Sequence, residues 1–142
     1  MPVNPSLIKV MSAMHLFWYR LTGGAFGGSF GGNPILLLTT TGRRTGRKRT
    51  TPLQYLADGE NMVLAASNGG NPRHPAWWLN LEHNPEAEVQ VRSEKKRVTA
   101  EKATGEERER LWGLMVEMYS GYAGYQETTK REIPVVVLRP RG

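Results

Sequence analysis

The fold is decided by three consecutive stretches, Ile35–Thr41 (ILLLTTT), Gly42–Arg49 (GRRTGRKR) and Thr50–Ala57 (TTPLQYLA). Apolar and β-branched residues fill the first and third stretches, and such residues favour strands. The two glycines of the middle stretch favour a turn between the strands. The three stretches therefore predict a β-hairpin.

The turn of this hairpin carries five Lys or Arg side chains within seven positions, Arg43 to Arg49. Charges so close together repel one another unless water or an anion lies between them. An anion-binding site and a solvated basic loop both explain such a run, and the charge alone does not choose between them.

A second candidate anion site follows the hairpin. Met62–Ala66 predicts a third strand, and it leads into Ser67-Asn68-Gly69-Gly70, where the glycines let the backbone approach a ligand closely. Pro75 suits the first residue of a helix, and N–H groups at a helix start attract phosphate or carboxylate. The chain thus offers two anion-binding devices separated by one strand.

These motifs together resemble the deazaflavin-dependent nitroreductase family, and the resemblance covers nearly the whole chain. The segments that carry it are Leu38–Gly46, Arg49–Leu53, Ala65–Gly70, His74–Leu81, the tyrosines 119, 122 and 125, and Ile133–Leu138. The family implies an α+β fold, a split β-barrel similar to the FMN-binding fold with helices on its rim. It also implies coenzyme F-420, a reduced deazaflavin with a glutamyl tail, as the cofactor.

The resemblance further implies which positions bind this coenzyme. Anchors for the phosphate and the glutamyl tail would be Arg43, Arg44, Thr45, Gly46 and Arg49, since a guanidinium pairs two phosphate or carboxylate oxygens. The deazaflavin ring would be lined by Thr50, Thr51 and Pro52. Backbone N–H groups and the Ser67 hydroxyl would come from Ala66, Ser67, Asn68, Gly69 and Gly70. The remaining side would be bounded by Pro75, Ala76, Trp77, Trp78 and Asn80, although both tryptophans also suit a core.

The candidate catalytic residues are Tyr119, Tyr122 and Tyr125, which alternate with Gly121 and Gly124. So many glycines predict a loop rather than a continuous helix. At least one phenol would hydrogen-bond an oxygen of the acceptor and supply a proton as hydride arrives. Aromatic packing over the barrel mouth explains the same residues equally well.

Several further elements complete the predicted fold. A helix over Ser6–Leu21 and a Gly-rich linker over Gly23–Gly32 would precede the barrel, so that residues 1–33 lead into a barrel of residues 34–142 within one domain. The other predicted elements are strands Glu86–Val91, Lys95–Ala103 and Val135–Leu138, and a helix over Glu106–Tyr119 with a capping box from Thr104 to Glu107 and a buried face of Leu111, Leu114, Met115 and Met118.

Composition and net charge exclude some classes of function but do not identify one. The formal charge of +6 favours an acidic partner, which could be nucleic acid, an anionic membrane or a polyanionic small molecule. The absence of Cys removes thiol nucleophiles, and the three scattered His lack metal-ligand spacing, so no metal is expected. Nucleic acid is not expected, because the basic residues gather in one turn without interleaved aromatics.

We therefore predict an oxidoreductase that moves hydride from reduced coenzyme F-420 to an electron-poor small-molecule acceptor, an enone, quinone or nitroaromatic. An FMN-dependent reductase on the same fold, or a non-catalytic binding module for deazaflavin or nucleic acid, are the alternatives. The chain is expected to be cytoplasmic, as a monomer or homodimer. The sequence leaves open peripheral contact with the anionic inner face of the cell membrane.

Overall fold

The structure, a computed structural model, describes residues 29–30 and 33–141. Its strands are β1 (Ser29–Phe30), β2 (Asn33–Thr41), β3 (Lys48–Gln54), β4 (Leu56–Asp58), β5 (Asn61–Ala65), β6 (Glu86–Val91), β7 (Glu94–Lys102) and β8 (Val135–Pro140). Its helices are the 3-10 turn η1 (Asn68–Gly70), α2 (Ala76–His83), α3 (Gly105–Met118) and α4 (Gly121–Thr128). The helix predicted over residues 6–21 lies outside the described residues, as does most of the Gly-rich linker.

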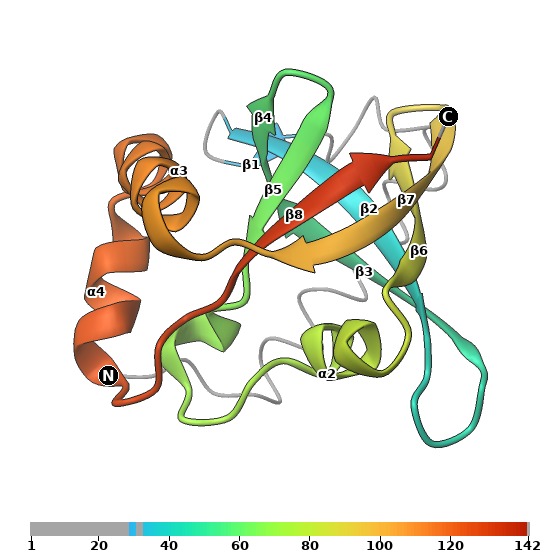
Figure 1. Cartoon of the computed structure of the whole chain (residues 1–142), viewed down its shortest axis with the longest axis horizontal. Coiled ribbons are helices and arrows are strands. Elements are labelled where there is room, and N and C mark those ends of the chain that lie inside the picture. Colours follow the sequence, from blue (N-terminus) through green and yellow to red (C-terminus); the bar gives the residue numbers. More distant parts are fainter. Residues whose placement is uncertain (1–28, 31–32, 142) are drawn as a thin grey trace.

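The strands form one antiparallel sheet that curls until its two ends meet. Its order is β1-β2-β6-β7-β8-β5-β4, with β3 also paired to β2. The end strands β3 and β4 are separated in the chain by Tyr55 alone, and the Tyr55 N–H donates to the Pro34 carbonyl at 3.2 Å. The predicted split β-barrel of an α+β protein is thereby confirmed (Figure 1).

Alternation along the strands explains why the closing strand is apolar throughout. On β8, Val136 and Leu138 point into the barrel core, while Val135 and Val137 pack outward in a cluster with Leu111 of α3. Successive side chains of a strand point to opposite faces of its sheet. Because both faces of β8 are covered over Val135–Leu138, these four positions are all apolar, and the first polar residue is the half-buried Arg139 near the end of the strand.

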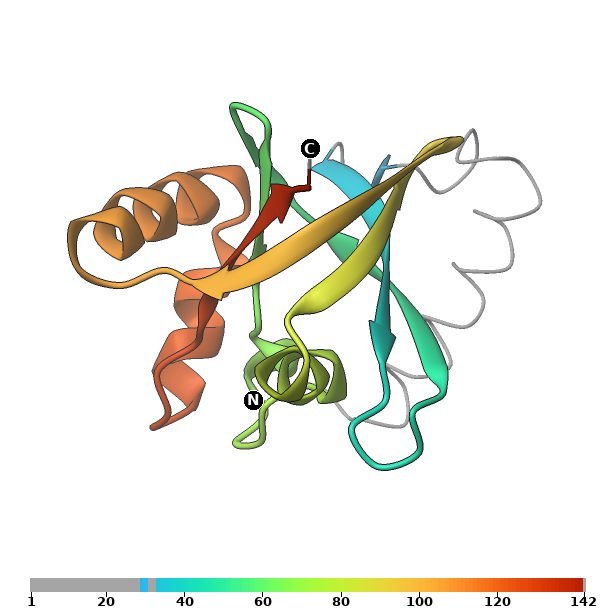
Figure 2. The same ribbon diagram turned by 45° about the vertical axis from the view of Figure 1, so that its right-hand side comes forward.

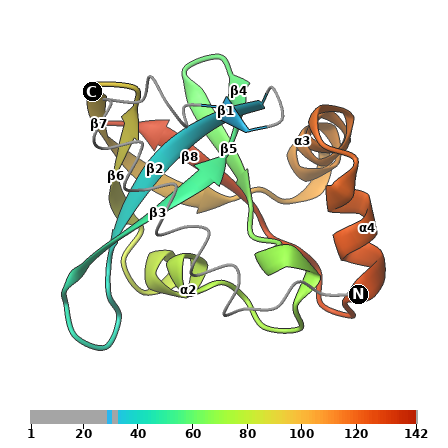
Figure 3. The same cartoon turned by 180° about the vertical axis from the view of Figure 1, so that it is seen from behind.

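The helices lie at two places around the barrel. Helices α3 and α4 lie side by side on one outer flank, whereas α2 crosses one end of the barrel (Figures 1 and 2). In the view from behind, the long turn between β2 and β3 reaches the same end as α2 (Figure 3). That end gathers the segments that the sequence marks as candidate anion sites.

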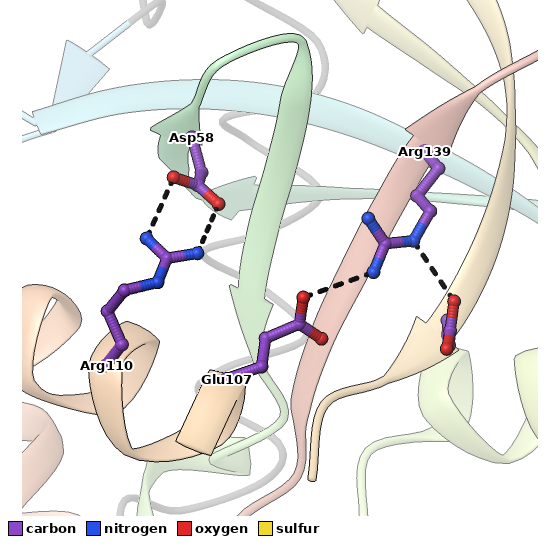
Figure 4. A network of polar contacts seen from close by, with 5 residues as sticks. Asp58, Glu107, Arg110 and Arg139 are labelled. Carbon is purple, nitrogen blue, oxygen red and sulfur yellow. Dashed lines mark hydrogen bonds and ion pairs between the residues drawn. The ribbon is translucent and has the colours of Figure 1, made fainter. Parts of the chain in front are cut away.

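Ion pairs on the surface connect α3 to the barrel. Arg110 of α3 makes two hydrogen bonds with the Asp58 carboxylate of β4, at 3.1 and 2.9 Å. Arg139 of β8 lies 3.0 Å from Glu101 and 3.3 Å from Glu107 of α3 (Figure 4). Exposed pairs of this kind add little stability, about 0–1 kcal/mol each, so buried apolar contacts hold the helix in place.

The predicted strands are confirmed within a few residues, but two details of the α3 prediction are wrong. Thr104 is the N-cap as expected, yet its side chain makes no capping hydrogen bond, and the Glu107 carboxylate bonds Arg139 instead. Leu114, expected on the buried face, is 37% exposed. Leu111 and Met115 are the buried residues of α3 in the cluster with β8, and Met118 packs partly buried against it.

Two further predictions on local structure are corrected. Pro75 is the N-cap of α2 rather than its first helical residue. Tyr122 and Tyr125 lie on helix α4, not in a loop, and only Tyr119 lies between helices. The glycines do not prevent α4 from forming, because this helix packs against α3 and η1.

Candidate functional site

The basic turn is held closed by its own backbone. The Gly42 N–H donates to the Arg47 carbonyl, and the Gly46 N–H donates to the Gly42 carbonyl, both at 2.8 Å. Gly46 has φ 71°, a left-handed conformation that few other residues adopt cheaply. The predicted hairpin turn is confirmed, and backbone hydrogen bonds close it.

A buried asparagine fixes this turn against α2. The Asn80 side-chain oxygen accepts from the Arg43 backbone N–H at 3.1 Å and from the Arg43 guanidinium at 3.2 Å. The Asn80 side-chain amide donates to the Thr40 hydroxyl at 3.1 Å. Both polar atoms of the Asn80 side chain therefore hold the turn in position.

The remaining cations of the turn face solvent. Arg44, Arg47, Lys48 and Arg49 are exposed, and none of them forms an ion pair with an acidic side chain among the described residues. The Lys48 ammonium donates to the Thr41 hydroxyl at 2.9 Å. The turn thus presents positive charge that the described part of the protein does not neutralise.

The loop after β5 has an unusual backbone. Ser67 is right-handed helical, with φ −77°, while Asn68, Gly69 and Gly70 are left-handed, with φ 49°, 62° and 79°. A right-handed residue followed by a left-handed one turns successive N–H groups toward one side, as in anion-binding nests. We call residues 66–71 the glycine loop.

Helix α4 lies directly against the glycine loop. A Cβ on Gly70 would overlap the Thr128 hydroxyl and lie 3.3 Å from the Tyr125 Cα. The Thr128 hydroxyl also lies 3.4 Å from the Gly70 carbonyl. Glycine at this position therefore lets the tyrosine-bearing helix close on the loop.

The three candidate tyrosines meet but are not equivalent. The hydroxyls of Tyr119 and Tyr125 lie 3.1 Å apart, and both residues are half-buried. Tyr122 is 6% exposed and packs edge-on against Tyr119, with ring centroids 5.0 Å apart. Burial, followed by the hydrogen bond with Tyr119, raises the pKa of Tyr125 to about 12, and burial also raises the pKa of Tyr122.

Other predicted site residues lie in the barrel wall. Trp77 and Trp78 are 7% and 6% exposed and belong to the barrel core, so the core interpretation holds for both. Thr50 bonds Thr39 at 2.8 Å in a shallow polar hollow on the outer face. Thr51 points to the opposite face from Thr50, because neighbouring strand residues alternate. The side chains of the two threonines therefore lie on opposite faces of β3.

Sequence analysis overlooked Arg131, which lies between α4 and β8. Its guanidinium donates to the carbonyls of Ala66 at 3.1 Å, Ser67 at 2.8 Å and Asn71 at 3.1 Å, and lies 3.0 Å from His74 Nδ1. Since a guanidinium only donates, Nδ1 accepts and the imidazole is neutral. Burial, together with the Arg131 charge, lowers the pKa of His74, which agrees with a neutral imidazole.

A split barrel that carries a cationic hairpin turn and a glycine loop at one end defines a protein of the FMN-binding-like class. The sequence model of the family described as F420H(2)-dependent quinone reductase matches residues 12–140. This chain belongs to that family. It is a reductase that uses reduced coenzyme F-420, which confirms the cofactor and the enzyme class predicted from the sequence.

Known relatives match three quarters or more of this chain. An F420H(2)-dependent quinone reductase of Mycobacterium tuberculosis is 42% identical over 143 residues, covering 98% of this chain and 93% of the relative. Among solved structures, an F420-H2 dependent reductase (FDR-A) has 43% identity and a TM-score of 0.69, covering 75% of this chain and 94% of its own. A structure described as a domain-swapped dimer has 38% identity and a TM-score of 0.72, covering 89% and 96%.

Among the described residues, no helix has the length and apolar content needed to cross a membrane.

Proposed function

We propose that this chain reduces quinones with hydride from coenzyme F-420, which binds along the barrel end formed by the basic turn, α2 and the glycine loop. The observation that carries this proposal is the pair of donor groups at that end. One is a turn whose exposed arginines have no acidic partner among the described residues, and the other is a backbone nest beside the tyrosines. Helix α2 lies between them (Figures 1 and 3).

The residues present suit the coenzyme. Phosphate and glutamyl carboxylates need several fixed cationic donors, and Arg44, Arg47 and Arg49 offer planar guanidinium groups on a turn clamped by Asn80. A ring edge with carbonyl groups needs N–H donors, which the glycine loop offers. We therefore assign the acidic tail to the basic turn and the ring to the glycine loop.

When bound, the reduced coenzyme supplies two electrons and one proton to the acceptor as hydride. Conversion of a quinone to a hydroquinone requires one further proton at the acceptor's oxygen. Tyr119 and Tyr125 are suited to this step, because these half-buried residues share a hydrogen bond between their hydroxyls, and Tyr125 lies on the helix that touches the glycine loop. The Tyr125 hydroxyl holds its proton at neutral pH, since its pKa, raised to about 12 mainly by burial, lies far above 7.

A quinone is our choice among electron-poor acceptors because 42%-identical relatives carry quinone reductase in their names. The test is anaerobic mixing of the protein and reduced coenzyme F-420 with a short-chain quinone, and separately with an enone and a nitroaromatic. We expect stoichiometric coenzyme oxidation, fastest with the quinone. The proposal is overturned if the coenzyme binds and none of the three acceptors is consumed.

The coenzyme site is tested separately by fluorescence titration with coenzyme F-420. Replacing Arg44 and Arg47 with Gln should weaken binding by on the order of tenfold or more, since charge-assisted hydrogen bonds are lost. Replacing Lys95 and Lys96, two exposed cations on β7, with Gln removes the same charge, provides the matched control and should leave binding unchanged. An equal loss of coenzyme affinity in both variants would show that the basic turn is not part of the coenzyme site.

We also propose that the chain forms a homodimer, because a neighbour with 38% identity is described as a domain-swapped dimer. Light scattering on the purified protein tests this, and a mass of one chain at micromolar concentration would reject it.

Peripheral contact with the cytoplasmic face of the membrane is a further proposal, motivated by the net charge of +6 and by the low water solubility of long-chain quinones. Sedimentation with anionic and neutral vesicles decides it. Binding to anionic vesicles only is expected, and absence of binding to either would end the idea.

A further inference from the structure

Arg131 directs its charge at backbone oxygens rather than at a carboxylate. Three carbonyls of the loop between β5 and α2 accept from its guanidinium, and no acidic side chain among the described residues forms an ion pair with it. Each such contact is a charge-assisted hydrogen bond, which is stronger than one between neutral groups. The guanidinium therefore stabilises the backbone conformation of this loop.

The hydrogen bonds of Arg131 fix the direction of two backbone N–H groups. In a trans peptide the carbonyl and the following N–H point in opposite directions. The Ala66 and Ser67 oxygens face Arg131, so the N–H groups of Ser67 and Asn68 face the other way. A cation at the oxygen also polarises the peptide, which makes its N–H a better donor.

The same residue connects the loop to the tyrosines. The Gln126 amide of α4 donates to the Arg131 carbonyl at 2.7 Å, and the Gln126 oxygen accepts from the Ile133 N–H at 2.9 Å. The Arg131 backbone is thus fixed to the helix that carries Tyr125, while its side chain holds the glycine loop. Arg131 therefore fixes the glycine loop and α4 relative to each other.

We propose that Arg131 is a positioning residue that presents the N–H groups of Ser67 and Asn68 to acceptor oxygens of the coenzyme's deazaflavin ring. This inference rests on the proposed function for the place of the ring. In this inference Arg131 touches neither coenzyme nor acceptor, because four of its five N–H donors are occupied by the three carbonyls and by His74.

The test compares Arg131→Lys with wild type. Lysine keeps the charge, but its compact ammonium cannot reach all four acceptors as the planar fork does. We expect the coenzyme Kd and the KM for reduced coenzyme to rise by on the order of tenfold, the value of one charge-assisted hydrogen bond. The kcat at saturating coenzyme should change little. The control Arg139→Lys alters an arginine on β8 that bonds two carboxylates away from the glycine loop, and it should leave every value unchanged.

Amide resonances of the protein provide a readout that does not require turnover. In the unliganded protein, Arg131→Lys should shift the Ser67 and Asn68 amide resonances, whereas Arg139→Lys should not. In wild type, adding oxidised coenzyme F-420 should shift the same two amides, which keeps the inference testable if Arg131→Lys fails to fold.

Unmoved Ser67 and Asn68 amides on coenzyme binding, or a folded Arg131→Lys protein with wild-type Kd, would overturn the inference. Failure of quinone turnover alone overturns the proposed acceptor and leaves these binding results to decide the role of Arg131.

Discussion

Tyr125 and Tyr122 are one helical turn apart on α4, but only Tyr125 has its hydroxyl in a shared hydrogen bond near the glycine loop. Tyr125→Phe should lower kcat for quinone reduction by about 100-fold, the usual range for loss of a positioned proton donor, with little change in coenzyme Kd. Tyr122→Phe should keep kcat near wild type, because that residue is buried in the cluster beneath α3. Steady-state kinetics on both variants check this, and equal losses would contradict it.

The raised pKa of Tyr125 predicts a loss of stability at high pH. Burial and the hydrogen bond with Tyr119 raise this pKa from 10.0 to about 12 in the folded protein. Between pH 10 and 12 the unfolded chain releases this proton and the folded chain keeps it, so the free energy of unfolding falls as pH rises. Below pH 10 the contribution is constant. Urea unfolding at pH 9, 10 and 11 should show a shallower decline for Tyr125→Phe than for wild type, and parallel curves would refute the assignment.

Single residues also mark the limit of what the sequence predicts. The five cations of the turn are recognised because they lie together in the sequence. Arg131 is not recognisable, because its partners lie 57 to 65 residues away and its neighbours Lys130 and Glu132 look equally polar. Asn80 is identified as a site residue, but that it clamps Arg43 and Thr40 depends on how the hairpin turn packs against α2.

At the scale of elements, the strands are predicted well because alternation and turn residues are local signals. Helix α4 is not predicted, because its formation depends on contacts with distant parts of the chain rather than on local signals. Its sequence GYAGYQET has two glycines and little helical preference, so it forms through packing against α3 and η1. The same dependence on packing explains why both tryptophans of α2 are core residues although their neighbours face the candidate site.

The two glycines of α4 should respond oppositely to substitution. A Cβ at Gly124 meets nothing within 4 Å, so Gly124→Ala should stabilise the protein by about 0.5–1 kcal/mol through helix propensity. A Cβ at Gly121 would overlap the Tyr119 ring, so Gly121→Ala should displace that ring and break its hydrogen bond to Tyr125. Thermal unfolding and kcat measured on both variants separate the effects. A stabilised Gly121→Ala protein with full activity would show that the Tyr119 position is unimportant.

At the scale of the whole molecule, the barrel separates stability from function. Its interior and the cluster under α3 and α4 are closed and apolar, whereas the candidate site lies at one end, where turn, α2 and glycine loop meet. The surface ion pairs of Figure 4 lie around α3, β4 and β8, away from this end. Substitutions in those pairs should therefore change neither coenzyme binding nor turnover, which suits Arg139→Lys as a control.

The net charge of +6 and the exposed turn together predict how the coenzyme arrives. A coenzyme with phosphate and carboxylate charges is attracted from a distance, and salt screens that attraction over about 8–10 Å at physiological strength. The association rate constant should therefore fall as salt is raised, while the dissociation rate constant, set by short contacts, changes less. Stopped-flow fluorescence at several salt concentrations measures both. Arg44→Gln should flatten the salt dependence of association more than Lys96→Gln, although both remove one positive charge. Equal flattening would mean that the overall charge, rather than the turn, steers the coenzyme.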